Sequence, residues 1–422
     1  MGLSERLMRL QRMGLHKGTD KLRPTAPPAP GSGIDQEIAG QWIRTPHGNC
    51  FLVQTTHSLQ QKHGGLPLGE CLTLPAGSLA ACGRDPLLAQ LDLRRAAFVD
   101  TETSGLAGGT GTFAFLLGIG TFDDVGFTVS QFFMQSPAAE KALLHAASEL
   151  LDRCTGLVSY NGRAFDLPLM NTRFLLNHQL PCLRDAPHLD LLFPVRRVWR
   201  ARLGSCTLGN VEKEALGVHR QELDVPGWLV PALYRDFLRT GSAVELRRVF
   251  YHNLEDILSL VTLVARLCRL FVSSQVPITV LDELPAIDRS SLGRVYEQLG
   301  WLGASEEAYR RALEASLPPE DRDIALGRLA LLLKRQQRRE DAARVWQLWS
   351  EEASDSRLTP FIELAKHHEW HTRDLSSAAD WTRQALQRAE SWPQSPQRSA
   401  ILSEVQHRLN RLQRKLVRDA EV

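Results

Sequence analysis

Between residues 94 and 162 the apolar positions of the chain form short runs, interrupted by one longer periodic stretch. Three runs predict strands joined by short turns: RRAAFVDTE (94–102), TFAFLLGIGTF (112–122) and GFTVSQFFM (126–134). The apolar positions of residues 139–154 recur with helical spacing, residues 156–162 form another buried strand-like run, and long helical patterns fill residues 166–272. Three strands, a helix, a strand and further helices in this order predict an α/β fold with a mixed sheet and flanking helices.

Residues 289–420 have a different pattern, which contains helical segments and no strand-like run. Residues 291–315 place Gly, Tyr and Ala at the spacings of a tetratricopeptide (TPR) unit, and two similar segments follow at 325–349 and 361–386. One such helical hairpin is too small to bury its own apolar face, so the segments must stack on one another. We therefore predict an all-α TPR-like helical-repeat domain over residues 289–420. An irregular helical bundle is the alternative.

The N-terminal part of the chain divides into two predicted segments. Residues 1–35 are a basic segment followed by a Pro/Gly linker, and Leu3, Leu7 and Leu10 predict a short amphipathic helix within it. Residues 36–94 mix short β-like pieces with Gly and Pro, which predicts an N-terminal extension whose fold the pattern does not specify. The α/β domain itself is predicted over residues 95–275.

Composition narrows the class of protein only slightly. The 422 residues are 43% hydrophobic and 23% charged, which is typical of a globular protein, and the formal net charge of +2 neither indicates nor excludes a nucleic-acid partner. The seven cysteines are odd in number and form no C-x-x-C motif, which favours free thiols in a reducing compartment. No apolar run reaches the roughly 18 residues of a transmembrane helix. We expect a cytoplasmic protein that does not bind membranes.

The first predicted strand ends with two acidic residues, Asp100 and Glu102. Residues two apart in a strand point to the same side, so the two carboxylates share one face. Carboxylates that lie side by side repel one another, and burying them without a partner is costly. A divalent cation with a preference for hard oxygen ligands, Mg²⁺ or Mn²⁺, resolves this conflict. A D-x-E pair on a solvated surface is the alternative.

A second polar group follows the buried run at 156–162. Asn161 and Gly162 end that run, and a helix is predicted to begin near Phe165 and Asp166. Asp166 would then lie at the N-terminus of the helix, beside the positive end of its dipole. A structural N-cap is the alternative role for Asp166, and packing is the alternative role for Phe165.

A third polar group lies at the start of a long apolar helix predicted over residues 247–267. His252 and Asp256 are four residues apart and share one face of that helix, while Tyr251 and Glu255 share the adjacent face. A solvated helix face is the alternative explanation for either pair.

Taken in order, these motifs are D-x-E on a strand, N-x-x-x-F-D at a strand-to-helix junction, and H-x-x-x-D on a later helix. The order resembles the DEDD superfamily of 3′–5′ exonucleases, whose fold is ribonuclease H-like. Residues 95–270 are also similar to the YprB family of ribonuclease H-like proteins. That resemblance rests on His188-Leu189-Asp190, Arg196-Arg197, Leu208 to Glu212, Asp224-Val225-Pro226-Gly227 and YHNLEDILSL (251–260).

The resemblance implies a metal-dependent nuclease that cleaves phosphodiester bonds from the 3′ end of single-stranded DNA or RNA with two Mg²⁺ or Mn²⁺ ions. The metal-binding carboxylates implied by position are Asp100, Glu102, Asp166 and Asp256, and the nucleic-acid-binding residues are Asn161 and Phe165. The implied domain order is a ribonuclease H-like exonuclease domain followed by the TPR-like region, which implies a protein partner or self-association.

One departure from the superfamily pattern concerns the residue that assists the attacking water. DEDD exonucleases carry Y-x-x-x-D or H-x-x-x-x-D in the last motif, whereas here His252 occupies the Tyr position and Tyr251 lies one residue upstream. An unperturbed imidazole titrates at about pH 6.5, which makes His252 the first candidate for the base and Tyr251 the second. The alternative function is a nucleic-acid-binding protein with a catalytically weak ribonuclease H-like domain, whose TPR-like tail recruits a protein.

Overall fold

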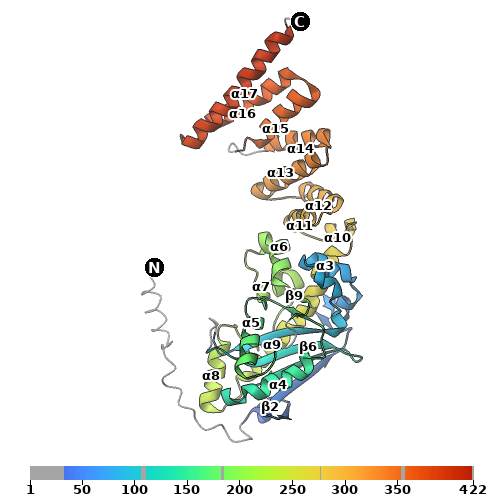
Figure 1. Cartoon of the computed structure of the whole chain (residues 1–422), viewed down its shortest axis with the longest axis vertical. Coiled ribbons are helices and arrows are strands. Elements are labelled where there is room, and N and C mark those ends of the chain that lie inside the picture. The colour runs from blue at the N-terminus through green and yellow to red at the C-terminus, as the bar shows by residue number, and fades with distance from the viewer. Residues whose placement is uncertain (1–32, 106–110, 182–184, 276, 353–356, 421–422) are drawn as a thin grey trace. The chain divides into compact units, whose positions relative to one another are not determined.

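The computed structural model describes residues 33–105, 111–181, 185–275, 277–352 and 357–420, and the short helix predicted from Leu3, Leu7 and Leu10 lies outside them. The described chain divides into two compact units that interleave along the sequence (Figure 1). The first comprises residues 33–61, 92–186 and 220–260. The second comprises residues 62–91, 187–219 and 261 onward.

The first unit is built on a mixed β-sheet. Among the described residues the sheet has seven strands, six of which belong to this unit in the order β1-β2-β7-β6-β5-β8. The bounds are β1 (Gln41–Thr45), β2 (Gly48–His57), β5 (Ala96–Thr103), β6 (Ala114–Phe122), β7 (Phe127–Phe133) and β8 (Gly156–Ser159). β5 pairs with β8 in parallel, while the other pairs within this order are antiparallel.

Helices of the first unit complete its core. They are α2 (Ile34–Glu37), α4 (Glu140–Leu151), α5 (Asp166–Leu176), α8 (Val230–Thr240) and α9 (Leu246–Cys268), of which α9 belongs to this unit up to Leu260. Apolar side chains of α4, α8 and α9 join those of the strands in one buried cluster. At its centre the ring of Tyr234 on α8 stacks on Phe115 of β6, with 3.9 Å between ring centroids. The sheet is thereby fixed as a platform for the polar residues at the ends of its strands.

Helix α5 is tied to α4 by a buried ion pair. Nη2 of Arg173 on α5 lies 2.5 Å from Oε2 of Glu140 at the start of α4, and the Glu140 side chain is 8% exposed. Asn177 donates a further hydrogen bond of 2.9 Å to the same oxygen. Because α5 begins at Asp166, this pair helps to set where that carboxylate lies.

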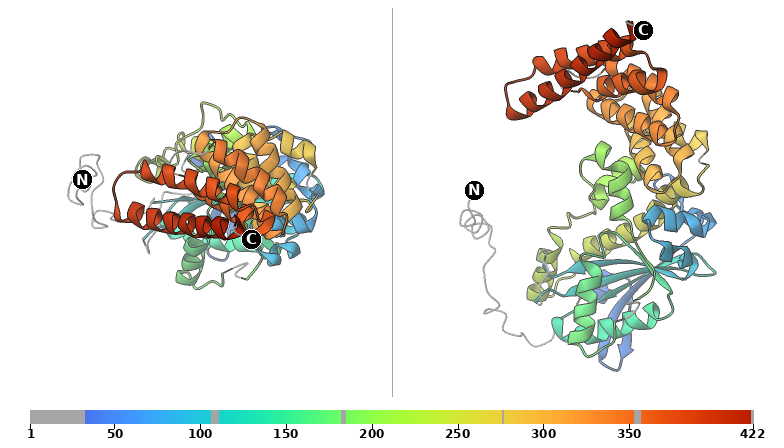
Figure 2. Two further views of the ribbon diagram at one scale, coloured as in Figure 1. Left: turned by 90° about the horizontal axis from the view of Figure 1, so that it is seen from above. Right: turned by 45° about the horizontal axis from the view of Figure 1, so that its top comes forward.

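The second unit is mainly helical. It contains the short strands β3 (Lys62–His63), β4 (Leu66–Pro67) and β9 (His188–Asp190). Its helices up to the linker are α3 (Ala76–Gly83), α6 (Leu192–Leu203), α7 (Leu208–Val211) and α10 (Ile278–Asp282). The C-terminal series is α11 (Ala286–Gln298), α12 (Leu302–Glu314), α13 (Pro319–Arg335), α14 (Arg339–Glu352), α15 (Thr359–His367), α16 (Leu375–Glu390) and α17 (Pro396–Ala420). Figure 2 shows successive helices of this series packed side by side (orange to red).

Two neighbouring helical hairpins of this series show the same packing of an aromatic ring against a glycine. A Cβ atom at Gly293 of α11 would lie 2.7 Å from the ring of Tyr309 on α12, and one at Gly327 of α13 would lie 2.9 Å from the ring of Trp349 on α14. Each glycine thus makes room for an aromatic ring of the following helix. The two glycines are 34 residues apart in the numbering, close to the TPR period of about 34.

The α/β fold predicted for the N-terminal part and the helical tail predicted after it are both confirmed. The predicted strands at 94–102, 112–122 and 126–134 correspond to β5, β6 and β7. Within residues 36–94, where the sequence pattern specified no fold, β1 and β2 form a hairpin that extends the sheet through β7. The short strand β9 interrupts the region 166–272, in which only helical patterns were predicted.

Candidate functional site

The acidic residues Asp100 and Glu102 lie near the end of β5, on the same face of the strand. Glu102 is only 8% exposed. Burial raises the pKa of both carboxyls well above the usual range, and the neighbouring carboxylates of Asp256 and Asp166 raise it further. The two residues predicted from the D-x-E motif therefore lie in a crowded, poorly hydrated cluster of acids and not on a solvated surface.

Asp166 enters this cluster from the junction between β8 and α5. The chain turns sharply at Asn161, whose φ of 64° is in the left-handed region that Asn tolerates better than most residues. Its carbonyl oxygen accepts hydrogen bonds from the backbone N–H groups of Ala164 and Phe165. Asp166 then accepts a hydrogen bond from the hydroxyl of Thr101, the residue between the two β5 acids. This contact joins the second motif to the first.

Phe165, predicted to contact nucleic acid or to pack, is 56% exposed. Packing in the core is therefore not its role in this structure. Asn161 acts as the turn residue that places Phe165 and Asp166 one after the other at the start of α5.

Asp256 reaches the cluster from α9 and contacts a guanidinium. Arg220 donates from Nη2 to Oδ1 of Asp256. Its Nη1 lies 3.3 Å from Oδ1 of Asp224 and 2.9 Å from Nδ1 of His252. The positive charge of Arg220 lowers the pKa of Asp100 and Glu102 and so opposes the effect of the surrounding acids. It offsets only part of the negative charge that these carboxylates carry when ionised.

His252 lies between two carboxylates. Its Nδ1 is 2.8 Å from Oδ1 of Asp224, and its Nε2 is 3.7 Å from Oδ2 of Asp256. Burial raises the pKa of Asp224, but the hydrogen bond to His252 and the charge of Arg220 outweigh burial, so that its pKa is lowered overall. An ionised Asp224 can only accept a hydrogen bond from Nδ1 of His252, whereas Arg220 can only donate one to the same nitrogen. The contact with Asp224 favours the neutral tautomer whose lone pair is on Nε2, and the contact with Arg220 favours the opposite tautomer.

Tyr251, the second candidate for the base, makes a different contact. Its hydroxyl oxygen accepts a hydrogen bond of 3.1 Å from the backbone N–H of Gln221. Burial is the main reason why its pKa is raised from the ordinary value. A phenol with a raised pKa is a weaker candidate for proton acceptance near neutral pH than an imidazole held by a carboxylate.

A buried amide fixes the position of Asp100. Asn253 of α9 is fully buried, and its Nδ2 donates to Oδ2 of Asp100 at 2.8 Å and to the carbonyl oxygen of the same residue at 3.3 Å. Gln131 of β7 donates in turn to Oδ1 of Asn253 at 2.9 Å. Gly118 of β6 is paired with Asp100 across the sheet and leaves the room that this amide occupies.

The structure thus brings together the residues predicted from three separate motifs. The carboxylates of Asp166 and Asp256 are close enough to those of Asp100 and Glu102 to raise their pKa values. His252 contacts Asp256. Arg220 and Asn253 were not among the site residues predicted from the sequence. Asn253 had a readable signal, because it is a polar residue on the buried stripe of α9 that continues through Ile257. Arg220 lies in the loop before α8, where no motif marks it as a site residue.

The donor set fits a hard divalent cation in its chemistry. Clustered carboxylate oxygens are the ligands that Mg²⁺ and Mn²⁺ prefer, and the raised pKa values of Asp100 and Glu102 reflect first their burial and then the repulsion that a bound cation would relieve. In the part of the chain that the structure describes, however, no three His, Cys, Asp or Glu side chains stand in an arrangement that would hold a metal ion. The contact of Arg220 with Asp256 engages one of the oxygens that such an ion would need.

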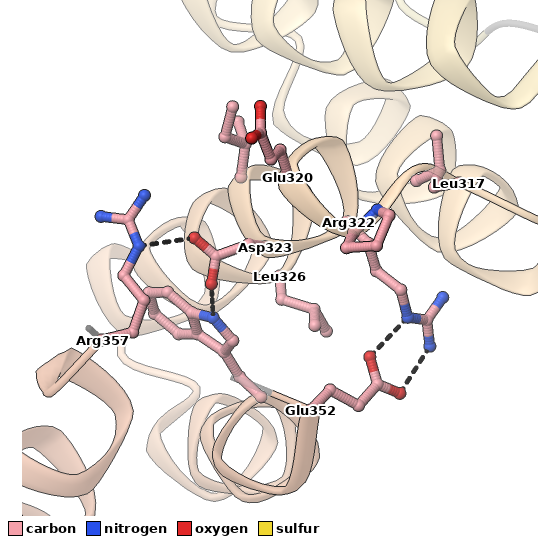
Figure 3. Close-up of a pocket in the computed structure, with 10 residues that line it drawn as sticks. Leu317, Glu320, Arg322, Asp323, Leu326, Glu352 and Arg357 are labelled. Atoms are coloured by element: carbon pink, nitrogen blue, oxygen red, sulfur yellow. Dashed lines mark hydrogen bonds and ion pairs between the residues drawn. The ribbon is translucent and has the colours of Figure 1, made fainter. Parts of the chain in front are cut away.

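A cavity of about 670 Å³ lies elsewhere, in the helical region of the second unit. Figure 3 shows contacts of four of its charged side chains: Arg322 pairs with Glu352, and Asp323 accepts from the indole of Trp349 and pairs with Arg357. The contacts of Arg322 with Glu352 and of Asp323 with Trp349 join helices α13 and α14, which gives these side chains a structural role.

No helix among the described residues combines the length and the apolar composition that crossing a membrane requires.

Comparisons with known proteins agree with the geometry of the site. Residues 97–268 match the family model described as the RNase_H superfamily. The Bacillus subtilis (strain 168) protein named "Uncharacterized protein YprB" is 36% identical to this chain over 297 residues, which is 68% of each of the two proteins. The matched region of the family model contains the strand with the acid pair, the β8–α5 junction and the helix that carries His252 and Asp256.

Proposed function

Because the chain belongs to the YprB-type family of ribonuclease H-like proteins, we propose that it is a metal-dependent nuclease that hydrolyses phosphodiester bonds. More specifically, we propose that the protein is a 3′–5′ exonuclease of the DEDD type that acts on single-stranded DNA or RNA. The observation that carries the proposal is the gathering of Asp100, Glu102, Asp166 and Asp256 from three separate segments, in a cluster that raises the pKa of the first two.

These four carboxylates would hold the metal, Mg²⁺ or Mn²⁺ in a two-ion site. When bound, the ions would supply an activated water and neutralise charge at phosphorus. Two side chains hold carboxylates of this site in place by hydrogen bonds. Asn253 fixes one oxygen of Asp100 through its amide, and Thr101 donates to Asp166. Both contacts restrain a carboxylate that would otherwise move away from its neighbours.

His252 is proposed to accept the proton of the attacking water at Nε2. In the tautomer whose Nδ1 donates to Asp224 at 2.8 Å, Nε2 carries the lone pair on the side of the ring where Asp256 lies. An imidazole with a carboxylate behind it is oriented and becomes a better base, because the carboxylate stabilises the imidazolium that forms. Asp224 is therefore proposed as the positioning residue for His252.

The test is the digestion of single-stranded DNA and RNA labelled at either the 3′ or the 5′ end, in the presence of Mn²⁺. The Asp166→Asn variant is the matched control, because the amide keeps an oxygen that can accept from Thr101 but loses the charge that a cation needs. We expect stepwise shortening from the 3′ end by the wild type and its loss in the variant. Cleavage that is equal in the two proteins, or that begins within the strand, would contradict the exonuclease proposal.

A second candidate function is supported by the contact of Arg220 with Asp256. A guanidinium that stays bonded to a metal-binding carboxylate would weaken metal binding, and the protein would then bind nucleic acid with little cleavage. Thermal unfolding with and without Mn²⁺ separates the two functions, since a ligand that binds only the folded state raises the melting temperature. A rise that Asp166→Asn abolishes supports the nuclease. No rise, together with binding of single strands, supports the binding protein.

The helical tail is proposed to be a TPR-like module that binds a protein partner or a second copy of the chain. The support is the repeated packing of Gly293 under Tyr309 and of Gly327 under Trp349 at the TPR period. Stacked hairpins of this kind build extended surfaces on which other proteins bind.

A further inference from the structure

Trp228 is exposed in a way that hydrophobic packing does not explain. It stands on the short turn before α8, and 68% of its surface is accessible. An indole that stays in water forgoes the large stabilisation that its burial would give. Exposed tryptophans are therefore expected where a partner covers the ring.

The turn that carries Trp228 is held firmly. The N–H of Leu229 donates to the carbonyl oxygen of Pro226 at 2.8 Å, and that of Val230 donates to the carbonyl oxygen of Gly227 at 3.3 Å. Val225, just before the turn, is fully buried in the core of the first unit. A ring presented on such a turn loses less conformational freedom on binding than one on a loose loop.

The turn also lies beside the proposed base. A Cβ atom at Gly227 would lie 3.8 Å from Nε2 of His252, the nitrogen assigned to proton acceptance. Consecutive Cα atoms are about 3.8 Å apart, so the backbone of Trp228 follows one residue after the position that approaches His252. The same short segment supplies Asp224, which holds His252 from the other side.

We propose that Trp228 is a stacking platform for an unpaired base of the nucleic acid whose phosphate enters the carboxylate cluster. This inference rests on the proposed nuclease function and narrows its substrate to strands with accessible base faces. A duplex hides those faces between stacked pairs, whereas a single strand offers them to a flat aromatic ring, whatever the base. Stacking also supplies attraction independent of charge, which matters beside a cluster of acids that repels phosphate.

The test measures binding of labelled oligothymidylate by fluorescence anisotropy, with full-length protein in the Asp166→Asn background, which prevents cleavage and measures stacking without the attraction between metal and phosphate. A second set of oligonucleotides replaces one base at a time with an abasic site. Trp228→Ala is expected to weaken binding of the intact strand roughly 5- to 100-fold. It should have almost no effect on the strand that lacks the stacked base. Trp228→Phe should restore most of the affinity, and Trp370→Ala, which removes another exposed tryptophan (52% accessible), should change nothing.

Each outcome decides the question. Unchanged affinity in Trp228→Ala, or an equal loss on intact and all abasic strands, would overturn the stacking role. If Trp228→Ala unfolds, the comparison of Trp228→Phe with Trp228→Leu replaces it, and equal affinity of those two variants would overturn the role. Failure of the wild type to cleave and of the Asp166→Asn parent to bind any strand would instead remove the proposed function itself.

Discussion

A single methyl group at Gly118 should disturb the site without touching any of its charges. Gly118 lies opposite Asp100 in the β5–β6 register. A Cβ atom there would lie 2.2 Å from Oδ1 of Asn253 and 2.3 Å from Cδ1 of Ile257, far inside the limit that real Cβ contacts observe. Asn253 cannot swing away freely, because its amide accepts from Gln131 and donates to Asp100.

The magnitude follows from two costs of Gly118→Ala. Forcing an extra methyl into a packed core costs about 1–3 kcal/mol. Displacing Asn253 leaves buried hydrogen-bonding groups unsatisfied, which costs about 1–3 kcal/mol for each group. Because the backbone relaxes in part, we expect a loss of roughly 2–4 kcal/mol in the free energy of unfolding of the first unit. Asp100 loses its amide donor as well, so metal-dependent activity should fall further than the loss of folded protein explains.

The assay combines urea unfolding with single-turnover cleavage at a temperature where the variant is fully folded. Gly303→Ala is the matched control, because a Cβ atom at this helical glycine would meet nothing within 4 Å. Alanine is better than glycine by about 0.5–1 kcal/mol in a helix interior and by less in the first turn, where Gly303 lies as the second residue of α12, so the control should be as stable as the wild type or slightly more so. A Gly118→Ala protein that unfolds and cleaves like the wild type would refute the role assigned to Asn253.

Two further predictions concern buried charges. Replacing Arg220 by Gln leaves Asp256 without its positively charged partner, so we expect a lower melting temperature in the absence of metal and a larger rise in melting temperature on adding Mn²⁺. Arg239→Gln, a change at an exposed arginine, is the control. A smaller rise in Arg220→Gln than in the wild type would contradict the competition between Arg220 and metal. Burial raises the pKa of Asp288 from 3.8 to about 6, although Arg202 acts in the opposite direction. The raised pKa stabilises the fold below about pH 4, and this contribution is lost as pH rises towards 6. Urea unfolding between about pH 4 and pH 6 should show the free energy of unfolding of the wild type falling by up to about 3 kcal/mol relative to that of Asp288→Asn. If the free energies of the two proteins instead change with pH in parallel, the raised pKa of Asp288 is refuted.

Local sequence patterns were sufficient for the elements that carry the acids. The β period places Asp100 and Glu102 on one face, and the helical period places His252 one turn before Asp256. These relations hold within a single segment, where the geometry of one strand or one helix fixes them. The strand β9 was missed because three residues are too few to establish a period.

The spatial relations between segments were decided by the tertiary structure. The sequence pattern gave no sign that residues 36–61 would extend the sheet, since pairing of β2 with β7 joins residues that are between 70 (His57 and Phe127) and 82 (Phe51 and Phe133) positions apart. The bond between Asn253 and Asp100 spans 153 residues and exists only because Gly118 lets α9 approach the sheet closely.

The charge balance of the site has the same origin. The amino-acid sequence by itself determined which residues can bind a cation and on which strand or helix face each one stands. Only the packing of the chain brought Arg220 to Asp256, 36 residues away, and set Asp224 behind His252. Periodicity acts along one segment, whereas the electrostatics of a site depend on distances between segments, and those are fixed by the core beneath them.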